Sequence, residues 1–150
     1  MGNISGPCEL CNTPGGTVLW ESPECRVVRI DDADYPGFCR VIWTAHVREM
    51  TDLASRERNL LMNIVFGVEH VIRQLFSPHK INLASFGNMT PHLHWHVIPR
   101  WRVDRHFPEP VWGCVHRETR PSRATSRRYG ASATFSSPTA TRTTHEAAAA

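Results

Sequence analysis

Short apolar runs in the first third of the chain, each closed by turn-forming residues, predict three β-strands. Residues 17–20 and 25–30 are two such runs, and the Glu-Ser-Pro-Glu stretch between them predicts the turn of a hairpin. Residues 31–37 hold three aspartates, a proline and a glycine, which are residues that turns and loops prefer. Residues 38–43 then predict the third strand.

The longest periodic stretch of the chain predicts an amphipathic α-helix. Ser55 can cap a helix that begins at the next residue, and Ser77 and Pro78 end it because proline cannot continue the backbone hydrogen-bond ladder. Two more strands, at residues 80–86 and 92–99, follow the helix. This order predicts an α+β fold, an antiparallel β-sheet with one long amphipathic helix against it. The apolar residues at helical spacing are Leu60, Leu61, Ile64, Val65, Val68, Val71, Ile72 and Leu75.

Three histidines, His92, His94 and His96, alternate with apolar residues in the last predicted strand. Successive side chains of a strand point to opposite faces, so the three imidazoles share one face, with neighbours about 7 Å apart. Imidazole titrates near neutral pH and serves as a nucleophile, a general acid or base, or a metal ligand. Strict alternation inside an apolar strand is hard to explain by packing alone. We therefore expect a functional site on this face, either catalytic or built on all three histidines as metal ligands.

Residues 92–98 read His-Leu-His-Trp-His-Val-Ile and fit every position of the signature of the histidine triad (HIT) superfamily, His-φ-His-φ-His-φ-φ with φ apolar. Residues 41–53, 81–89 and 107–113 also resemble segments of that family, so the resemblance spans about residues 7–114. It implies the HIT fold and assembly as a homodimer. It also implies a nucleotide hydrolase or transferase acting at the α-phosphate of a nucleoside phosphate derivative, such as a phosphoramidate or a dinucleoside polyphosphate.

The resemblance assigns the chemistry to the last two histidines. The middle histidine of the family attacks phosphorus and carries a transient nucleotidyl group, and that position is His94 here. His96 would contact the phosphoryl oxygens or orient the site. Imidazole suits the attacking role because it is neutral yet basic near neutral pH and leaves readily, so one difficult displacement becomes two easier ones. The rival interpretation is a zinc-binding scaffold or interaction protein with a HIT fold and little turnover.

The resemblance also places the nucleotide-binding residues. Asn88 stands four residues before His92, where many relatives have a glutamine that reaches the phosphate, and Met89 stands where relatives often carry a serine. In many members, an acidic residue at the end of the second strand binds the ribose hydroxyls. Asp31 is the predicted equivalent, with Asp32 as the alternative, because the loop that follows is one residue shorter than in those relatives.

Cys8 and Cys11 form a Cys-x-x-Cys pair, the second candidate site. Alone, such a pair is redox-active, metal-binding or simply two small buried residues. A tetrahedral zinc site needs four ligands, and two distant histidines commonly complete the pair. Zinc-binding bacterial HIT proteins supply them from the lone histidine after a strand and from the first histidine of the triad, here His46 and His92. The resemblance thus implies a structural zinc ion on these four residues. As a zinc ligand, His92 would not act as a proton carrier in the reaction.

The composition changes abruptly after about residue 114. Residues 1–116 carry eleven Lys or Arg and twelve Asp or Glu, a net charge of −1, whereas residues 117–150 carry six Arg and two Glu, a net charge of +4. We expect a HIT domain over 1–116 and a disordered basic tail over 117–150, which has too few apolar residues to fold. An inert tail, a regulatory or nucleic-acid-binding tail and the product of a shifted reading frame are all compatible with this composition. The folded domain is not expected to bind nucleic acid.

The apolar runs and the cysteines of the sequence indicate in which cellular compartment the protein is expected. No apolar run reaches the roughly 18 residues of a membrane span, and no signal peptide opens the sequence. The five cysteines are an odd number, which without a secretory signal favours a reducing compartment over a disulfide framework. We therefore expect a cytoplasmic protein with no membrane partner. A small-molecule nucleotide substrate is what the HIT resemblance implies.

Overall fold

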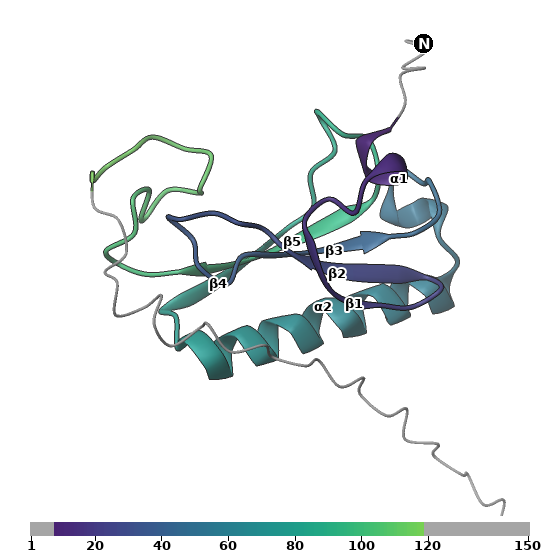
Figure 1. Cartoon of the computed structure of the whole chain (residues 1–150), viewed down its shortest axis with the longest axis horizontal. Helices are drawn as coiled ribbons and strands as arrows, with labels where there is room; N and C mark the ends of the chain where they lie inside the picture. Colours follow the sequence, from purple (N-terminus) through teal and green to yellow (C-terminus); the bar gives the residue numbers. More distant parts are fainter. Residues whose placement is uncertain (1–7, 119–150) are drawn as a thin grey trace, which may run out of the picture.

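A five-stranded antiparallel sheet with one long helix along it makes up the fold (Figure 1). The computed structural model describes residues 8–118. The strands lie in the order β1-β2-β3-β5-β4, so β1 and β4 form the two edges. The predicted α+β architecture is confirmed. In chain order the elements are α1 (Glu9–Asn12), β1 (Thr17–Glu21), β2 (Cys25–Arg29), β3 (Cys39–Trp43), the short 3₁₀ helix η1 (Met50–Asp52), α2 (Ser55–Phe76), β4 (Lys80–Ala84) and β5 (His94–Arg100).

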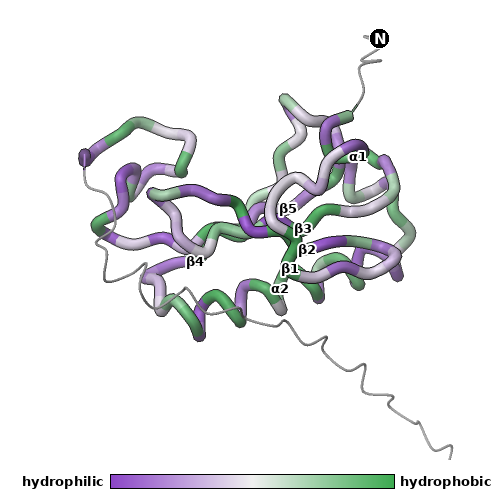
Figure 2. The backbone as a smooth tube through the Cα atoms, viewed as in Figure 1, coloured by the Kyte–Doolittle hydropathy of each residue, from purple (hydrophilic) through white to green (hydrophobic). Residues whose placement is uncertain are grey.

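Alternation along the strands gives the sheet one face packed on α2 and an opposite face. We call this opposite face the open face because α2 does not cover it, although Leu10 packs there on Val28 and Ile42. In β3, Cys39, Val41 and Trp43 join one buried cluster with Val97 of β5 and Leu61 of α2. The main core therefore lies between the sheet and α2, which runs along the lower side of the sheet in Figure 1. Figure 2 shows hydrophobic and hydrophilic residues alternating along α2, as expected for a helix with one stripe against a core. The intervening residues of β3 and β5 lie on the open face.

Most of the apolar stripe predicted for the helix is buried. Leu60 and Leu75 are 37% and 46% exposed and Val71 is half-buried, so these three lie at the edges of the stripe. The buried members are Leu61, Ile64, Val65, Val68 and Ile72.

The helix begins one residue earlier than predicted. Ser55 is already helical, and Ala54 is the N-cap, whose side chain makes no cap hydrogen bond. The Glu57 carboxylate accepts a hydrogen bond from the Ala54 backbone N–H at 2.7 Å. Its negative charge in the first turn also interacts favourably with the helix dipole and so stabilises the helix. At the other end Ser77 takes a left-handed conformation and Pro78 follows, so the predicted stop is confirmed.

The last strand begins at His94, two residues later than predicted. The His92 backbone N–H donates to the Thr90 oxygen at 2.8 Å in a tight turn, so His92 lies outside β5. Proline at position 91 cannot donate to a strand ladder, which is consistent with this late start. The prediction that all three histidines share one strand face is therefore wrong for His92.

The other strands differ from their predicted ranges by one or two residues. β1 extends to Glu21, which pairs with Arg26, and β4 ends at Ala84, where its pairing with β5 stops. β2 ends at Arg29, and β3 begins at Cys39. The helices α1 and η1 were not predicted because each is too short to show a helical period.

The predicted tail, residues 117–150, lies outside the described residues except for its first two positions. The Arg117 guanidinium donates to the backbone oxygen of Phe107 at 2.5 Å and to that of Asp104 at 3.3 Å. This residue therefore contacts the domain body. Among residues 8–118, no helix is long and apolar enough to cross a membrane.

Candidate active site and metal centre

His94 and His96 lie side by side on the open face of the sheet. Both belong to β5, and they are only 6% and 4% exposed. Their ring centroids are 4.8 Å apart, with the rings edge to face. Phe38 and Phe86 flank the His96 ring at centroid distances of 5.7 and 6.0 Å. The two imidazoles thus contact each other in a largely apolar setting.

The His94 ring has a defined tautomer. Its Nδ1 lies 2.6 Å from the His92 backbone oxygen, which can only accept, so Nδ1 carries the proton and Nε2 holds a free lone pair. Burial lowers the pKa of His94; the hydrogen bond to His92 partly offsets this effect, and the charges of Arg40 and His92 add to it. The ring is therefore mainly neutral at pH 7, which is the form that a nucleophilic imidazole needs.

The His96 ring is also neutral. Burial, followed by the charges of nearby His94 and Arg40, lowers the pKa of His96 to about 3. Its Nδ1 is buried and has no hydrogen-bond partner within residues 8–118. His96 therefore offers an unused hydrogen-bonding atom beside His94.

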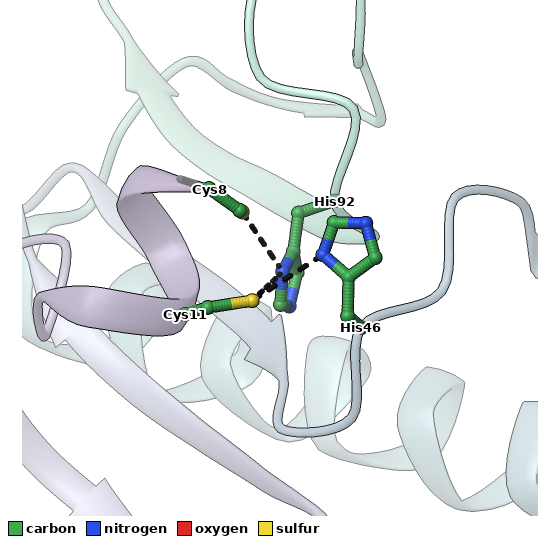
Figure 3. A group of neighbouring side chains, drawn as sticks. All are labelled: Cys8, Cys11, His46 and His92. Carbon is green, nitrogen blue, oxygen red and sulfur yellow. Dashed lines mark hydrogen bonds between the residues drawn. The ribbon is translucent and has the colours of Figure 1, made fainter. Parts of the chain in front are cut away.

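Cys8, Cys11, His46 and His92 converge beside α1 (Figure 3). One donor atom from each lies within 4.8 Å of all the others. His92 Nδ1 is 3.4 Å from Cys8 Sγ and 3.5 Å from Cys11 Sγ. His46 Nδ1 is 3.3 Å from Cys11 Sγ. Ordinary Zn–S and Zn–N bonds in a tetrahedral site place sulfur and nitrogen about 3.5 Å apart, so these side chains lie close enough to bind one metal ion.

Three separate segments supply these four side chains. Cys8 and Cys11 lie at the two ends of one turn of α1, His46 lies in the loop after β3, and His92 precedes β5. The His92 ring is oriented by its Nε2, which donates to the Trp43 backbone oxygen at 2.7 Å. Nδ1 is then unprotonated and faces the two sulfur atoms, as in metal-binding histidines whose other nitrogen donates to a carbonyl. Burial lowers the pKa of His92, which also favours the neutral ring.

The predicted nucleotide-binding residues make no hydrogen bond to these histidines within the described part of the chain. Asn88 is exposed in the loop between β4 and β5, and Met89 beside it is 98% exposed. Asp31 is exposed just after β2. Asp32 has a local role, because its Oδ1 accepts a hydrogen bond from the Asp34 backbone N–H at 2.9 Å in the turn. Of the two predicted alternatives, Asp31 makes no such side-chain hydrogen bond within residues 8–118.

A buried ion pair anchors the loop after β5, and sequence reasoning missed it. Arg100 and Asp104 are 2% and 1% exposed, and Arg100 Nε and Nη2 donate to the two carboxylate oxygens at 2.7 and 3.0 Å. Three backbone N–H groups also donate to this carboxylate, those of Trp101, His106 and Phe107. Burial opposes ionisation, but Arg100 and the backbone donors lower the pKa of Asp104 below its ordinary value. The only signal in the sequence is a four-residue spacing, which by itself indicates a helical pair.

The anchored loop carries an aromatic side chain to the histidines. Arg100 Nη2 also donates to the Glu109 backbone oxygen at 2.7 Å. Three residues further on, the Trp112 ring lies edge to face with His96 at 5.2 Å and with Phe86 at 4.7 Å. Trp112 and Phe86 are 55% and 49% exposed, so both rings border the site and keep surface available to a ligand.

The comparison with known proteins identifies the family of this chain. The HIT domain model matches residues 14–103, more than half of the 150-residue chain. This chain belongs to the HIT family. The AP-4-A phosphorylase of Mycobacterium tuberculosis is 32% identical over an alignment of 84 residues, and the match covers 52% of this chain and 43% of that protein. The match thus spans less than half the length of this curated relative.

Solved structures of histidine triad proteins share the fold of this HIT domain. One is from Bradyrhizobium japonicum; it is 26% identical with a TM-score of 0.64, and the match covers 77% of this chain and 86% of that one. Another, from Marinobacter aquaeolei VT8, is also 26% identical with a TM-score of 0.64, and the match covers 81% of this chain and 88% of that one. The predicted family and fold are therefore confirmed.

The buried ion pair makes a prediction about the stability of this HIT domain. Asp104→Ala leaves the Arg100 guanidinium buried without its carboxylate, so we expect the free energy of unfolding to fall by about 3–5 kcal/mol. The partly exposed pair of Arg105 and Asp34, 3.3 Å apart, provides a matched control. Asp34→Ala should cost less than about 1 kcal/mol. Urea denaturation measures both variants, and equal losses would show that the buried pair is not the anchor of the loop.

Proposed function

We propose that this protein hydrolyses or transfers the nucleotidyl group of a nucleoside phosphate derivative through a nucleotidyl-histidine intermediate on His94. The observation that carries the proposal is the 2.6 Å hydrogen bond from His94 Nδ1 to the His92 backbone oxygen. It leaves Nε2 unprotonated in a buried ring whose pKa burial lowers. Such a ring can attack phosphorus at neutral pH and can leave again in the next step.

Two displacements complete the proposed reaction. Nε2 of His94 attacks the α-phosphorus, and the bond to the leaving group breaks as that group departs with the electron pair. Water or another acceptor then attacks the same phosphorus and loses its proton, and the bond to Nε2 breaks to restore the neutral ring. His96, whose ring centroid is 4.8 Å from that of His94, donates a hydrogen bond to the phosphoryl oxygens as negative charge develops on them.

The proposed nucleotide contacts are Asn88 to the phosphate and Asp31 to the ribose hydroxyls. Both side chains are exposed, and the local bond that occupies Asp32 supports Asp31 as the ribose ligand. Dinucleoside polyphosphates are one proposed substrate class, which the name of the mycobacterial AP-4-A phosphorylase supports. Phosphoramidates are the other. A panel of adenosine and guanosine phosphoramidates, dinucleoside polyphosphates and nucleoside-linked sugars would separate these classes.

The second part of the proposal is a structural zinc ion held by Cys8, Cys11, His46 and His92. The S···N separations of 3.3 to 3.5 Å support a tetrahedral ion, and thiolate with imidazole is a donor set that zinc prefers. Four protein ligands leave no open coordination position. The ion would therefore tie the N-terminal segment to the sheet and would not activate a water molecule.

The assembly and the domain boundary complete the proposal. We propose a homodimer in the cytoplasm, which is compatible with β4 as a sheet edge, and a HIT domain over residues 1–116. Arg117, the next residue, still contacts this domain. Residues 1–116 carry a net charge of −1, so no nucleic-acid partner is proposed for the folded domain.

The zinc site predicts metal content and stability together. Purified full-length protein should hold about one zinc ion per chain. Cys8→Ser and His46→Ala should each lose the zinc and lower the melting temperature by at least about 10 °C, because metal binding contributes to folding. Cys114→Ser changes an exposed cysteine outside the cluster and should alter neither quantity. Metal-free wild-type protein with the same melting temperature as the zinc-loaded form would contradict the proposal.

The nucleophile predicts a selective loss of activity. His94→Asn removes the atom that forms the adduct, so turnover on the best substrate of the panel should fall by at least about 10³-fold. His96→Ala removes one hydrogen-bond donor and should cost about 10²–10³-fold. Zinc content and melting temperature should stay unchanged in both variants. His79→Asn alters an exposed histidine and is the control. Full activity of His94→Asn would overturn the assignment, and a wild-type protein inactive on the whole panel would favour the scaffold interpretation.

A further inference from the structure

Arg40 lies next to the catalytic histidines although no sequence motif pointed to it. It belongs to β3 and pairs directly with His96 of β5, while its neighbour Ile42 pairs with His94. Directly paired residues of an antiparallel sheet have Cβ atoms about 5 Å apart on the same face. Arg40 is therefore on the open face beside both histidines. Consistent with this position, its charge is one of the causes, after burial, that lower the pKa values of His94 and His96.

The Arg40 guanidinium is not satisfied by the protein. Its Nε is buried and has no hydrogen-bond partner within residues 8–118, and no carboxylate of that range forms an ion pair with it. Two arginines on the neighbouring strands differ in this respect. Arg26 of β2 donates to the backbone oxygens of the N-terminal segment, and Arg100 of β5 donates to Asp104. A buried donor without an acceptor costs free energy, so an unpaired one needs an explanation.

A second unpaired nitrogen lies across the strand pair from Arg40. His96 Nδ1 is the other buried side-chain nitrogen without a partner in the described chain. Val28 of β2, which pairs with Arg40 on its other side, is fully buried and apolar, and it offers no acceptor. The two unpaired atoms thus belong to adjacent residues of the face that carries His94. The Arg40 side chain is only half-buried, and an anionic ligand on this face would supply acceptors to its guanidinium.

We propose that Arg40 is a further phosphate-binding residue, which together with His96 holds the non-bridging oxygens of the substrate phosphate that His94 attacks. The inference rests on the proposed function for the location of that phosphate. A guanidinium presents a planar fork of donors that matches a phosphate group, and its positive charge strengthens each hydrogen bond. Arg40, beside both histidines, would bring a positive charge to the phosphate.

Two other roles for Arg40 are distinguishable from phosphate binding. Glu9, an exposed residue of α1, is the acidic group whose charge acts on Arg40, so Arg40 could serve a structural pairing with it. Arg40 could also contact the base or the ribose. A structural role predicts that Glu9→Gln reproduces the loss caused by replacing Arg40. A base or ribose contact predicts equal losses of affinity for a nucleoside and for its monophosphate.

The test compares ligands that differ only in the phosphate. Calorimetric titration of the zinc-loaded full chain would use AMP and GMP, adenosine and guanosine, and pyrophosphate. Arg40→Met should weaken binding of the preferred monophosphate by about 10–100-fold and leave binding of the matching nucleoside unchanged. Arg40→Lys, which keeps the charge but not the fork, should recover part of the loss. Arg29→Met, at an exposed position of β2, and Glu9→Gln should bind like the wild type.

Each remaining outcome decides one of the two proposals. Unchanged monophosphate binding in Arg40→Met, an equal loss for nucleoside and monophosphate, or the same loss in Glu9→Gln overturns the role of Arg40. A wild-type protein that binds none of these phosphates also overturns it. If pyrophosphate or a monophosphate binds through Arg40 but no substrate is turned over, the phosphate site stands and the proposed function falls. If Arg40→Met does not fold, Arg40→Gln, which keeps polarity without charge, takes its place under the same criteria.

Discussion

The hydrogen bonds of one residue, His92, connect the two sites of this HIT domain. Its ring belongs to the cysteine–histidine cluster, with Nδ1 facing both sulfur atoms and Nε2 donating to Trp43. Its backbone oxygen accepts the proton of His94 Nδ1, which sets the tautomer of the proposed nucleophile. The turn at Thr90–His92, which places His92 outside β5, orients both the His92 ring and its backbone oxygen. In the proposed mechanism, a metal ion on the cluster would restrain His92 and thereby the hydrogen bond that leaves His94 Nε2 free.

The two faces of the sheet differ in polarity. The face against α2 is apolar and holds the main core, whereas the open face carries His94, His96, the half-buried Arg40 and the buried pair of Arg100 and Asp104. Buried polar groups cost free energy unless they are paired. Arg100 and Asp104 satisfy each other and hold the loop that brings Trp112 to His96. Arg40 and His96 are adjacent to the proposed nucleophile, and each has a buried nitrogen without a partner among residues 8–118. In the proposal, a ligand phosphate would accept hydrogen bonds from the half-buried Arg40 guanidinium.

Local periodicity was enough to predict much of this arrangement. The helix, the strand runs and the contact of His94 with His96 follow from periods of 3.6 and 2 that are readable within a few residues. The prediction for His92 was wrong because a local turn from Thr90 to His92, and not the alternation, decides where β5 starts. Arg40 was missed because its neighbourhood depends on the register of β3 against β5, and strand register joins segments far apart in the chain. The set of four cluster residues came from family resemblance, since spacing alone does not choose the histidines that complete a cysteine pair.

The central claim is that His94 becomes covalently bonded to the substrate phosphorus, and an adduct measurement tests it most directly. Native protein would be mixed with an excess of a turned-over substrate, quenched within milliseconds and analysed by peptide mass mapping. We predict a mass increase of one nucleotidyl group at His94, in an acid-labile bond typical of a phosphorus–nitrogen linkage, which disappears as substrate is exhausted. An adduct on His92 or His96, or steady turnover without any adduct, would contradict His94 as the nucleophile.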